Sequence, residues 1–562
     1  MFRFNKAVLL ISLLSASKAF AVATQTYNSA GVNPANITWD LESQLPTAPA
    51  NKPAAIPYLA QPKPTEQADS NQPTFILKGV KLLHQSPVPA QVQAVYQKSI
   101  NKPIDFQGVK NMAAEMQATY RNLGDILVQV VVPPQEIDKA SGVVQLQVIE
   151  GQIQEVVLTG DASKGAKTQL ERYAAALRNE DPITYKTMDH FITLANNLPG
   201  IDVTATLVPS KTLGASDLMI NVKRKAYFSY VSFNNYSSQY IGPGQALAGV
   251  SIYDLFAADS LSVSASSSTA NQFALRYYSV GYDVVTGPYS TEINPVFSRT
   301  VTHPGAGLTP FDMVGVSSKS TLNVNQPLLV SSRQDLTFIS SLYHLSSSNS
   351  IFTNQLIYND LITAATAGLQ YKGVFLNSYN DMDAYTTVGL PILGAPATPN
   401  NPSRANGVSQ FIILDVDTST THYITRKLSF VLAGTGQITP NPLLTSEQLG
   451  FGGMQFGQGF NSYVISGDNG IMGSFALRYD LPLHGYFNLL QPQVFYNAGY
   501  VGNNDTLAGT YNHAWGQSAG VGLNVAIFHS IQIAMNLAKP LTLSQGTSGN
   551  NWQAFINATA IF

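Results

Sequence analysis

The strongest constraint on the fold is a regular alternation of apolar and polar residues along residues 226–562. Between Leu523 and Leu537 the leucine, valine, isoleucine and methionine residues share one parity and the asparagine, serine and glutamine residues share the other, which is the period of β-strands. The final segment from Trp552 to Phe562 repeats this pattern. Because lipid offers no water to unpaired backbone groups, strands with one lipid-facing side must close into a cylinder. Residues 226–562 therefore predict a transmembrane antiparallel β-barrel of about 16 strands.

Composition distinguishes this region from the rest of the chain. Only 11% of the 562 residues are charged and 44% are hydrophobic, yet past residue 21 no apolar run reaches the length of about 18 residues that a spanning helix needs. Most charged residues precede residue 226. A soluble β-sandwich array is the alternative, but it would not need so few charges. The net charge of -2 argues against nucleic acid as a partner, and the absence of cysteine excludes disulfides and thiolate zinc sites.

The N-terminal part has the features of an exported protein. Residues 1–21 predict a signal peptide, because Arg3 and Lys6 precede a short apolar run and small residues follow at a cleavage position. Residues 22–74 predict an N-terminal segment with a short helix from Trp39 to Leu45, capped by Thr38, and then a proline-rich linker.

Two units of the same plan follow, at residues 75–151 and 152–225. Each has a strand, two helical stretches and a pair of strands, which indicates two α+β domains. In the second unit Met188, Phe191 and Ala195 fall on one helical face. This face is predicted either to bind a partner or to pack in the domain core.

Residues 130–160 (VVVPPQEIDKASGVVQLQVIEGQIQEVVLTG) and 194–210 (LANNLPGIDVTATLVPS) resemble the POTRA domains of two-partner secretion transporters, the TpsB family of haemolysin secretion and activation proteins. The resemblance extends over nearly all of the mature chain. It implies a monomeric barrel in the lipid of the outer membrane, with POTRA domains in the periplasm. Such a protein recognises a large exoprotein and translocates it unfolded. A barrel assembly factor and a passive pore or adhesin are the alternatives.

The resemblance also implies that residues 439–470 form a loop folded into the barrel. Its predicted tip consists of Gly457, Gln458, Gly459 and Phe460. The barrel strand that faces it is predicted to carry Phe495, Asn497 and Gly499. The family has an arginine and an aspartate where this chain has Gln458 and Asn497. We expect these amides to form a neutral hydrogen bond that holds the loop less tightly than an ion pair. In the family the segment corresponding to residues 22–44 plugs the barrel.

Signatures of catalysis are missing from the sequence. It contains no Walker A, His-Glu-x-x-His or Gly-x-Ser-x-Gly pattern, and the glycine-rich segment has Gln455 where a dinucleotide fingerprint needs its third glycine. His190 and His529 are expected to be structural or solvated, and Asp381 and Asp383 to lie in a hydrophilic loop. We therefore expect no enzyme activity, cofactor or metal.

Overall fold

The computed structural model describes residues 29–46, 74–83, 87–125, 127–136, 141–179, 183–212, 215–269, 274–352, 355–505, 511–545 and 551–562. The predicted signal peptide and most of the proline-rich linker lie outside these residues. Among the described helices, none has both the length and the hydropathy needed to cross a membrane.

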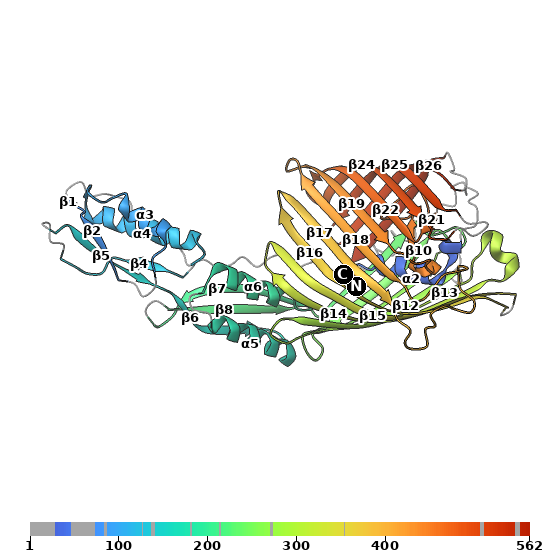
Figure 1. Cartoon of the computed structure of the whole chain (residues 1–562). Helices are drawn as coiled ribbons and strands as arrows, with labels where there is room; N and C mark the ends of the chain where they lie inside the picture. The colour runs from blue at the N-terminus through green and yellow to red at the C-terminus, as the bar shows by residue number, and fades with distance from the viewer. Residues whose placement is uncertain are drawn as a thin grey trace.

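A closed antiparallel β-barrel forms the C-terminal part (Figure 1). The order of its strands around the wall follows the sequence, and the last strand pairs with the first. Since β22 and β23 are successive segments of one interrupted strand along β24, the described chain has 16 barrel strands, as predicted. The segments are β9 (Tyr227–Asn234), β10 (Gln245–Tyr253), β11 (Asp259–Ser268), β12 (Leu275–Thr286), β13 (Thr291–Thr302), β14 (Val314–Val330), β15 (Gln334–Ile351), β16 (Gln355–Phe375), β17 (Ser378–Gly389), β18 (Ile412–Tyr423), β19 (Leu428–Ile438), β22 (Asn469–Tyr479), β23 (Leu481–Pro482), β24 (Phe487–Gly502), β25 (His513–Ile527), β26 (Ile531–Leu543) and β27 (Gln553–Ile561).

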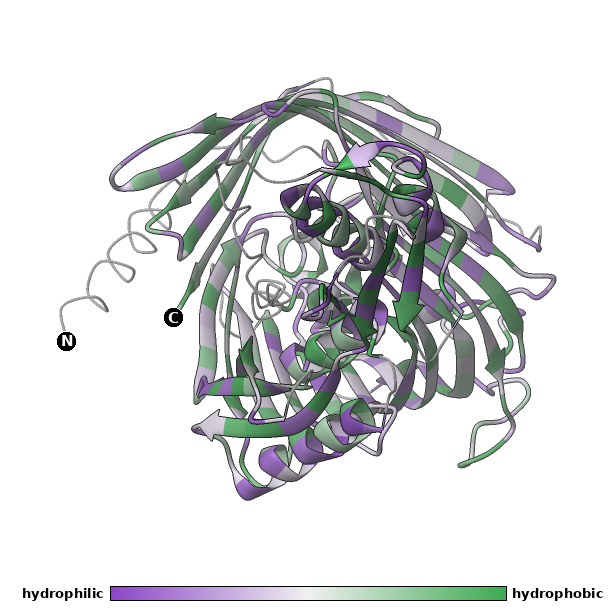
Figure 2. Cartoon of the chain, turned by 90° about the vertical axis from the view of Figure 1, so that its left-hand side faces the viewer, coloured by the Kyte–Doolittle hydropathy of each residue, from purple (hydrophilic) through white to green (hydrophobic). Residues whose placement is uncertain are grey.

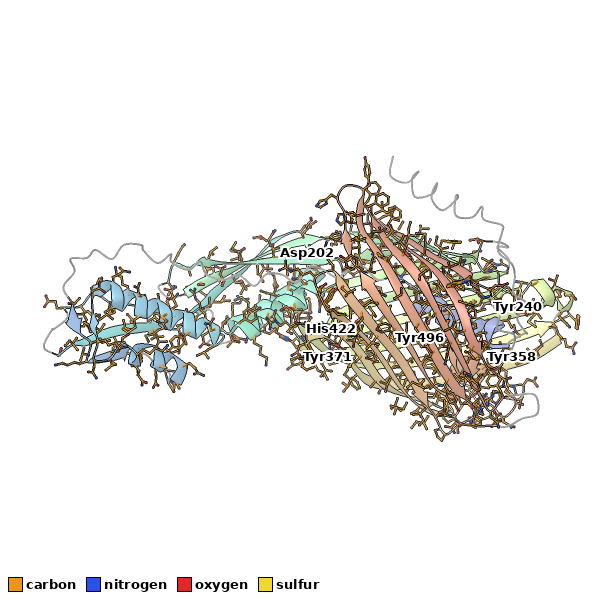
Figure 3. The ribbon with its side chains drawn as sticks, turned by 90° about the horizontal axis from the view of Figure 1, so that it is seen from above. Asp202, Tyr240, Tyr358, Tyr371, His422 and Tyr496 are labelled. Atoms are coloured by element: carbon orange, nitrogen blue, oxygen red, sulfur yellow. The ribbon has the colours of Figure 1, made fainter. Side chains whose placement is uncertain are left out.

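The alternation in the sequence separates the outer wall from the lumen. Leu537 is exposed on the outer wall, whereas its neighbour Asn536 is buried on the inner side. Tyr496 likewise is exposed on the outside of β24 (Figure 3). Apolar and polar residues alternate along many barrel strands in Figure 2. Asp381 and Asp383 lie on β17 rather than in the predicted loop, because the polar parity of this strand faces the lumen.

The first α+β domain precedes the barrel and has its own core. In its sheet β5 lies between the parallel β2 and the antiparallel β4, and two helices cover the sheet. The elements are β1 (Phe75–Ile76), β2 (Gly79–Leu83), α3 (Ala90–Gln97), β3 (Pro103–Ile104), α4 (Phe106–Asn122), β4 (Gln129–Val131) and β5 (Val143–Ile149). Figure 1 shows this domain farthest from the barrel.

The second α+β domain repeats this plan next to the barrel. Its elements are β6 (Gln152–Gly160), α5 (Lys164–Arg178), α6 (Tyr185–Asn196), β7 (Ile201–Pro209) and β8 (Ala215–Arg224). Met188 and Ala195 are buried in its core, and the half-buried Phe191 packs against that core and the ring of Tyr173. Of the two roles predicted for this face of α6, packing in the domain core is the one that the contacts of Met188 and Ala195 show.

Turns on one barrel rim, which we call the near rim, hold the second domain in place. In the turn between β10 and β11, Asp254 accepts a hydrogen bond from Ser163 N (2.7 Å) and pairs with Arg224 Nε (3.2 Å). Gln169 Nε2 donates to Gly287 O (2.7 Å) in the β12–β13 turn, and Ser332 N in the β14–β15 turn donates to Asp189 Oδ2 (3.0 Å). Ala258 in the β10–β11 turn and Val330, the last residue of β14, join the domain core. The domain is thus fixed against the barrel through both polar and apolar contacts.

Asp254 is the polar centre of this contact, because its side chain is fully buried and also receives the hydroxyl of Ser163, the N-cap of α5. Replacing Asp254 with asparagine removes the ion pair and the charge-assisted hydrogen bonds, which stabilise the contact by about 1–3 kcal/mol each. We expect faster hydrogen exchange in the first turn of α5, measured by mass spectrometry. Asp161→Asn, at an exposed neighbouring position, is the matched control, and equal exchange in both variants would contradict the prediction.

Candidate functional site in the barrel lumen

A short helix, α2 (Pro34–Ser43), occupies the barrel lumen (Figure 1). Asn33 caps it by accepting a hydrogen bond from Ala35 N (2.9 Å), and Pro34 fits the first helical turn because its missing N–H would be unsatisfied there. The predicted helix began too late: Thr38 is inside the helix and its hydroxyl donates to Pro34 O (2.8 Å). The proline and asparagine before Trp39 were the overlooked start signal.

Apolar contacts surround α2 on opposite sides. Ile37 and Leu41 pack with Leu275 and Tyr277 of the β12 wall. Ala35 packs in a second cluster that contains residues of β15, β16 and β18, with Trp39 at its margin. Because the helix is enclosed rather than seated on one surface, its burial depends on the lumen remaining closed around it.

A buried ion pair joins α2 to the wall. Lys319 Nζ of β14 lies 2.6 Å from Glu42 Oε2 and 3.1 Å from the ring centroid of Trp39. The Lys319 side chain is 5% exposed, so water screens its charge weakly. Ser298 Oγ donates to the other carboxylate oxygen of Glu42 (2.7 Å). These contacts combine charge pairing, hydrogen bonding and a cation–π interaction at one end of the helix.

The other polar contacts of α2 connect it to several elements. The hydroxyls of Thr38 and Thr300 lie 2.7 Å apart, and Asn234 Nδ2 donates to Gln44 Oε1 (2.9 Å). Ser462 Oγ, in the loop between β19 and β22, donates to Asp40 Oδ2 (3.3 Å). Burial raises the pKa of Asp40 to about 6. The helix is therefore connected to the wall and to this loop at the same time.

The loop between β19 and β22, residues 439–468, is called the inward loop here. It contains η3 (Thr445–Glu447) and a small hairpin of β20 (Leu449–Phe451) and β21 (Ile465–Gly467). Phe451 and Phe460 are buried in one cluster with residues of the wall, and their ring centroids are 5.8 Å apart. At the tip, Gly459 N donates to Ser518 Oγ of β25 (3.3 Å). The structure therefore places the tip residues against the barrel wall.

The expected hydrogen bond between Gln458 and Asn497 does not form. Gln458 Nε2 instead donates to Met454 O (3.0 Å) within the loop. Within the described residues, Gln458 Oε1 and both amide atoms of the fully buried Asn497 have no hydrogen-bond partner. Glutamine is shorter than the arginine that the family resemblance implies at this position, so its side chain has a shorter reach as well as no charge. Aromatic packing and Ser518 hold the tip instead.

An ion-pair cluster at the base of the inward loop was missed by the sequence analysis. Arg404, between β17 and β18, pairs with Asp468 at the end of the loop (2.6 Å) and with Asp505 after β24. Asp468 is fully buried and also accepts from Leu443 N (3.0 Å) and Asn504 N (2.8 Å). This cluster joins three loops on the rim opposite the second α+β domain, which we call the far rim.

A cavity remains between α2, the inward loop and the wall. Its volume is about 730 Å³. Asp415, Asp417 and Glu447 contribute carboxyl groups to its lining. Glu447 accepts a hydrogen bond from Tyr343 Oη (2.8 Å), and burial is the main cause that raises the pKa of Glu447. Such a space, lined by carboxyl and amide groups as well as apolar side chains, can hold water and hydrophilic chain.

Phe451 can seat only because two wall residues lack side chains. A Cβ at Gly499 would lie 2.3 Å from Phe451 Cδ2, and one at Gly516 would lie 2.6 Å from Phe451 Cε1. Gly499→Ala therefore overpacks the contact, at a cost of about 1–3 kcal/mol. We expect more frequent channel openings in planar-bilayer recordings of the reconstituted protein. Gly473→Ala is the control, since its Cβ would lie 3.9 Å from the nearest atom, and equal opening frequencies would contradict the prediction.

Comparison with known proteins identifies relatives that match most of the chain. Heme/hemopexin transporter protein HuxB of Haemophilus influenzae strain 86-028NP is 23% identical over 506 residues, which cover 87% of each chain. Outer membrane transporter CdiB of Dickeya dadantii strain 3937 is 20% identical over 473 residues, which cover 80% of each chain. The solved structure of CdiB from Escherichia coli has a TM-score of 0.69 at 18% identity, covering 90% of this chain and 94% of that chain, and therefore has the same fold.

Family models give the assignment. The model of the ShlB-type POTRA domain matches residues 75–151, the first α+β domain. The model of the haemolysin secretion/activation protein family ShlB/FhaC/HecB matches residues 214–523, more than half of the chain. The chain therefore belongs to the haemolysin secretion/activation family ShlB/FhaC/HecB, whose members are outer-membrane transporters with periplasmic POTRA domains rather than enzymes.

Proposed function

We propose that this transporter recognises a large exoprotein in the periplasm and moves it, unfolded, through the barrel to the cell surface or the medium. The observation that supports this most directly is the filling of the lumen. Both α2 and the inward loop contact the wall through side chains, whereas the wall itself is continuous strand pairing. They can be displaced without breaking the barrel, and a 16-stranded barrel is wide enough for an aqueous channel once they move.

Capture of the exoprotein is assigned to the edges of the two periplasmic sheets. The sheet order is β2-β5-β4 in the first domain and β6-β8-β7 in the second, so the outer strands of each sheet carry edge backbone groups. An extended peptide can add to such an edge through main-chain hydrogen bonds. This mode suits an unfolded substrate, because it needs no folded surface on the partner and does not use the buried Met188 and Ala195.

Direction would come from the exoprotein itself. A domain that folds outside the cell gains about 5–15 kcal/mol relative to its unfolded chain, so an emerged and folded segment does not return through the barrel. No nucleotide would then be needed at the barrel. In this scheme α2 and the inward loop keep the lumen closed between transport events, and entry of the substrate displaces both.

Deletion of the gene tests the proposal. The culture medium and the outer membrane of the deletion strain and of a complemented strain are compared by quantitative mass spectrometry. We expect the loss of one large exoprotein from the medium, with the outer-membrane profile unchanged. General depletion of barrel proteins from the membrane would instead indicate an assembly factor. An unchanged protein profile would indicate a passive pore or an adhesin.

A further inference from the structure

The outer wall of the barrel carries cationic side chains near the far rim. Arg276 is the second residue of β12, which begins at this rim, and it shares its parity with the exposed Tyr278 and Val280. Arg299 of β13 shares its parity with the exposed Phe297. Lys539 of β26 lies between the exposed positions Leu537 and Leu541. In the far-rim half of the described strands, the charged side chains that face outward are these three cations.

Arg276 and Arg299 lie close together, whereas Lys539 is remote from both. The register of β12 and β13 pairs Tyr278 with Arg299, so the two guanidinium-bearing residues flank one tyrosine on neighbouring strands. Lys539 lies beyond β27 and β9, on the other side of the seam that closes the barrel. Arg299 Nη1 donates to Ser318 Oγ (3.1 Å) of β14, the strand on the other side of β13 from β12. The α+β domains are periplasmic and the second of them contacts the near rim, so the far rim is extracellular and this pair faces the outer leaflet.

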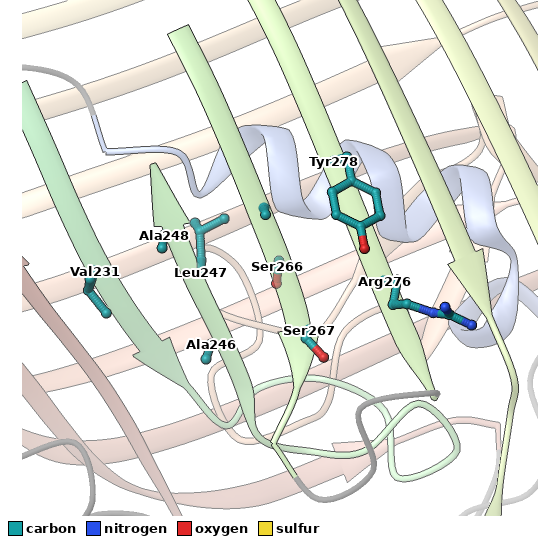
Figure 4. Close-up of a pocket in the computed structure, with 9 residues that line it drawn as sticks. Val231, Ala246, Leu247, Ala248, Ser266, Ser267, Arg276 and Tyr278 are labelled. Atoms are coloured by element: carbon teal, nitrogen blue, oxygen red, sulfur yellow. The ribbon is translucent and has the colours of Figure 1, made fainter. Parts of the chain in front are cut away.

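A shallow depression lies beside Arg276 and Tyr278 (Figure 4). Its volume is about 410 Å³, and its outward-facing floor is made of small side chains on β10 and β11. These are Ala246, Ala248, Ala265 and Ser267. Val231 borders it on one side, and Tyr278 with Arg276 borders it on the other (Figure 4). A hollow of this volume, with a floor of alanine and serine in a lipid-facing wall, can receive a segment of an acyl chain.

We propose that the depression and the two arginines form a binding site for a phosphate-bearing lipid of the outer leaflet. One acyl chain would lie over Ala248 and Ala265, and the phosphate would accept hydrogen bonds from Arg276 and Arg299. Guanidinium groups bind phosphate with two parallel N–H donors, and an arginine beside hydrocarbon is stabilised by such a counter-charge. The outward charges are positive and lie at the end of the strands, at the level of the lipid headgroups. This position favours a lipid phosphate over a protein partner.

The site lies next to the barrel seam. The depression spans β9 to β12, and β9 pairs with β27 through five residue pairs in the described strands, against nine between β10 and β11. A lipid seated across β9, β10 and β11 would therefore stabilise the side of the barrel with the shortest strands. This inference is independent of the transported cargo, so it can fail or succeed without affecting the proposed function.

The test uses the purified full-length protein in a neutral detergent. The probe is a bisphosphorylated, multiply acylated glucosamine disaccharide, and zwitterionic phosphatidylcholine and inorganic phosphate serve as comparison ligands. Adducts are counted by native mass spectrometry, and heat-dependent migration in gel electrophoresis verifies that each variant is folded. We expect the probe to bind wild-type protein, and both comparison ligands to bind at least tenfold more weakly, because phosphatidylcholine has no net negative charge and inorganic phosphate has no acyl chain.

Variants separate the two halves of the site. Arg276→Ala should weaken binding of the probe by about tenfold or more, since it removes charge-assisted hydrogen bonds. Ala248→Leu should weaken it similarly by filling the depression while leaving every charge in place. Lys539→Ala is the matched control, because it also removes an outward cation near the same rim, and it should bind like wild type. Equal weakening by Lys539→Ala, wild-type binding by Ala248→Leu, or equal binding of inorganic phosphate would overturn the proposal.

Discussion

Replacing Lys319 with methionine is expected to release α2 from the lumen and open the barrel. The substitution leaves the Glu42 carboxylate without the cation that lies 2.6 Å away and removes the cation over the Trp39 ring. Breaking one side of a buried ion pair costs about 3–5 kcal/mol, because an uncompensated charge remains. The fraction of molecules with α2 bound in the lumen should then be much smaller than in wild type. Planar-bilayer recordings should show a large increase in the open fraction of single channels.

The chain offers a matched control for this experiment. Lys372 of β16 also faces inward and pairs with Asp381, but both side chains are more than a third exposed. Such a pair contributes about 0–1 kcal/mol, so Lys372→Met should conduct like wild type. The double variant Glu42→Gln, Lys319→Met removes both charges and should recover part of the closed state. If Lys319→Met and Lys372→Met gave the same open fraction, α2 would not depend on this ion pair.

Replacing Arg404 with alanine is expected to open the base of the inward loop. Asp468 is fully buried and would lose its cation, and the loops that carry Asp468 and Asp505 would no longer be joined. The expected cost is again about 3–5 kcal/mol, which corresponds to at least a hundredfold larger open population. The chain contains no cysteine, so a single introduced thiol at the buried Ser446 reports on loop opening without background. Its labelling by a membrane-impermeant maleimide should accelerate about a hundredfold.

The control for Arg404 is Arg426→Ala, in an exposed turn between β18 and β19 on the near rim. It removes the same side chain without leaving a buried carboxylate, so labelling at position 446 should match the parent protein. A labelling rate in Arg404→Ala equal to that of the control would show that aromatic packing alone holds the loop. The comparison therefore measures the ion-pair cluster separately from the contacts of Phe451 and Phe460.

The barrel was predictable because the pattern that specifies it lies within each strand. Parity along each strand decides which residues meet lipid, and it could be read in segments such as Leu523 to Leu537 without knowing any partner strand. The α+β domains were predictable for a similar reason, since helical and strand periods alternate within each unit. The role of Met188 was harder to predict. A periodic apolar face indicates that something covers the helix, but it does not distinguish the sheet of the same domain from a partner protein.

The contacts in the lumen could not be predicted because they join distant segments. Glu42 and Lys319 are separated by most of the N-terminal half of the chain, and nothing near Glu42 indicates a lysine on β14. One signal was present: Lys319 is the one charged residue in its strand and lies on the polar parity. The Gln458 and Asn497 hydrogen bond failed for the complementary reason. The prediction took the contact from an arginine and an aspartate and applied it to the shorter Gln458 and to Asn497. The tip instead contacts the wall through Gly459 N and Ser518 Oγ.

Anchoring of the second α+β domain makes the entrance of the barrel one-sided. Its described contacts involve the turns that follow β10, β12 and β14, which are neighbours along one arc of the near rim. The arc formed by the turns after β16, β18, β23 and β25 lies opposite. An incoming polypeptide would thus approach from that opposite arc, with the edge of a sheet on one flank and open rim on the other. The periplasmic entrance of the barrel therefore has one side covered by the second α+β domain and one open side, even without a substrate.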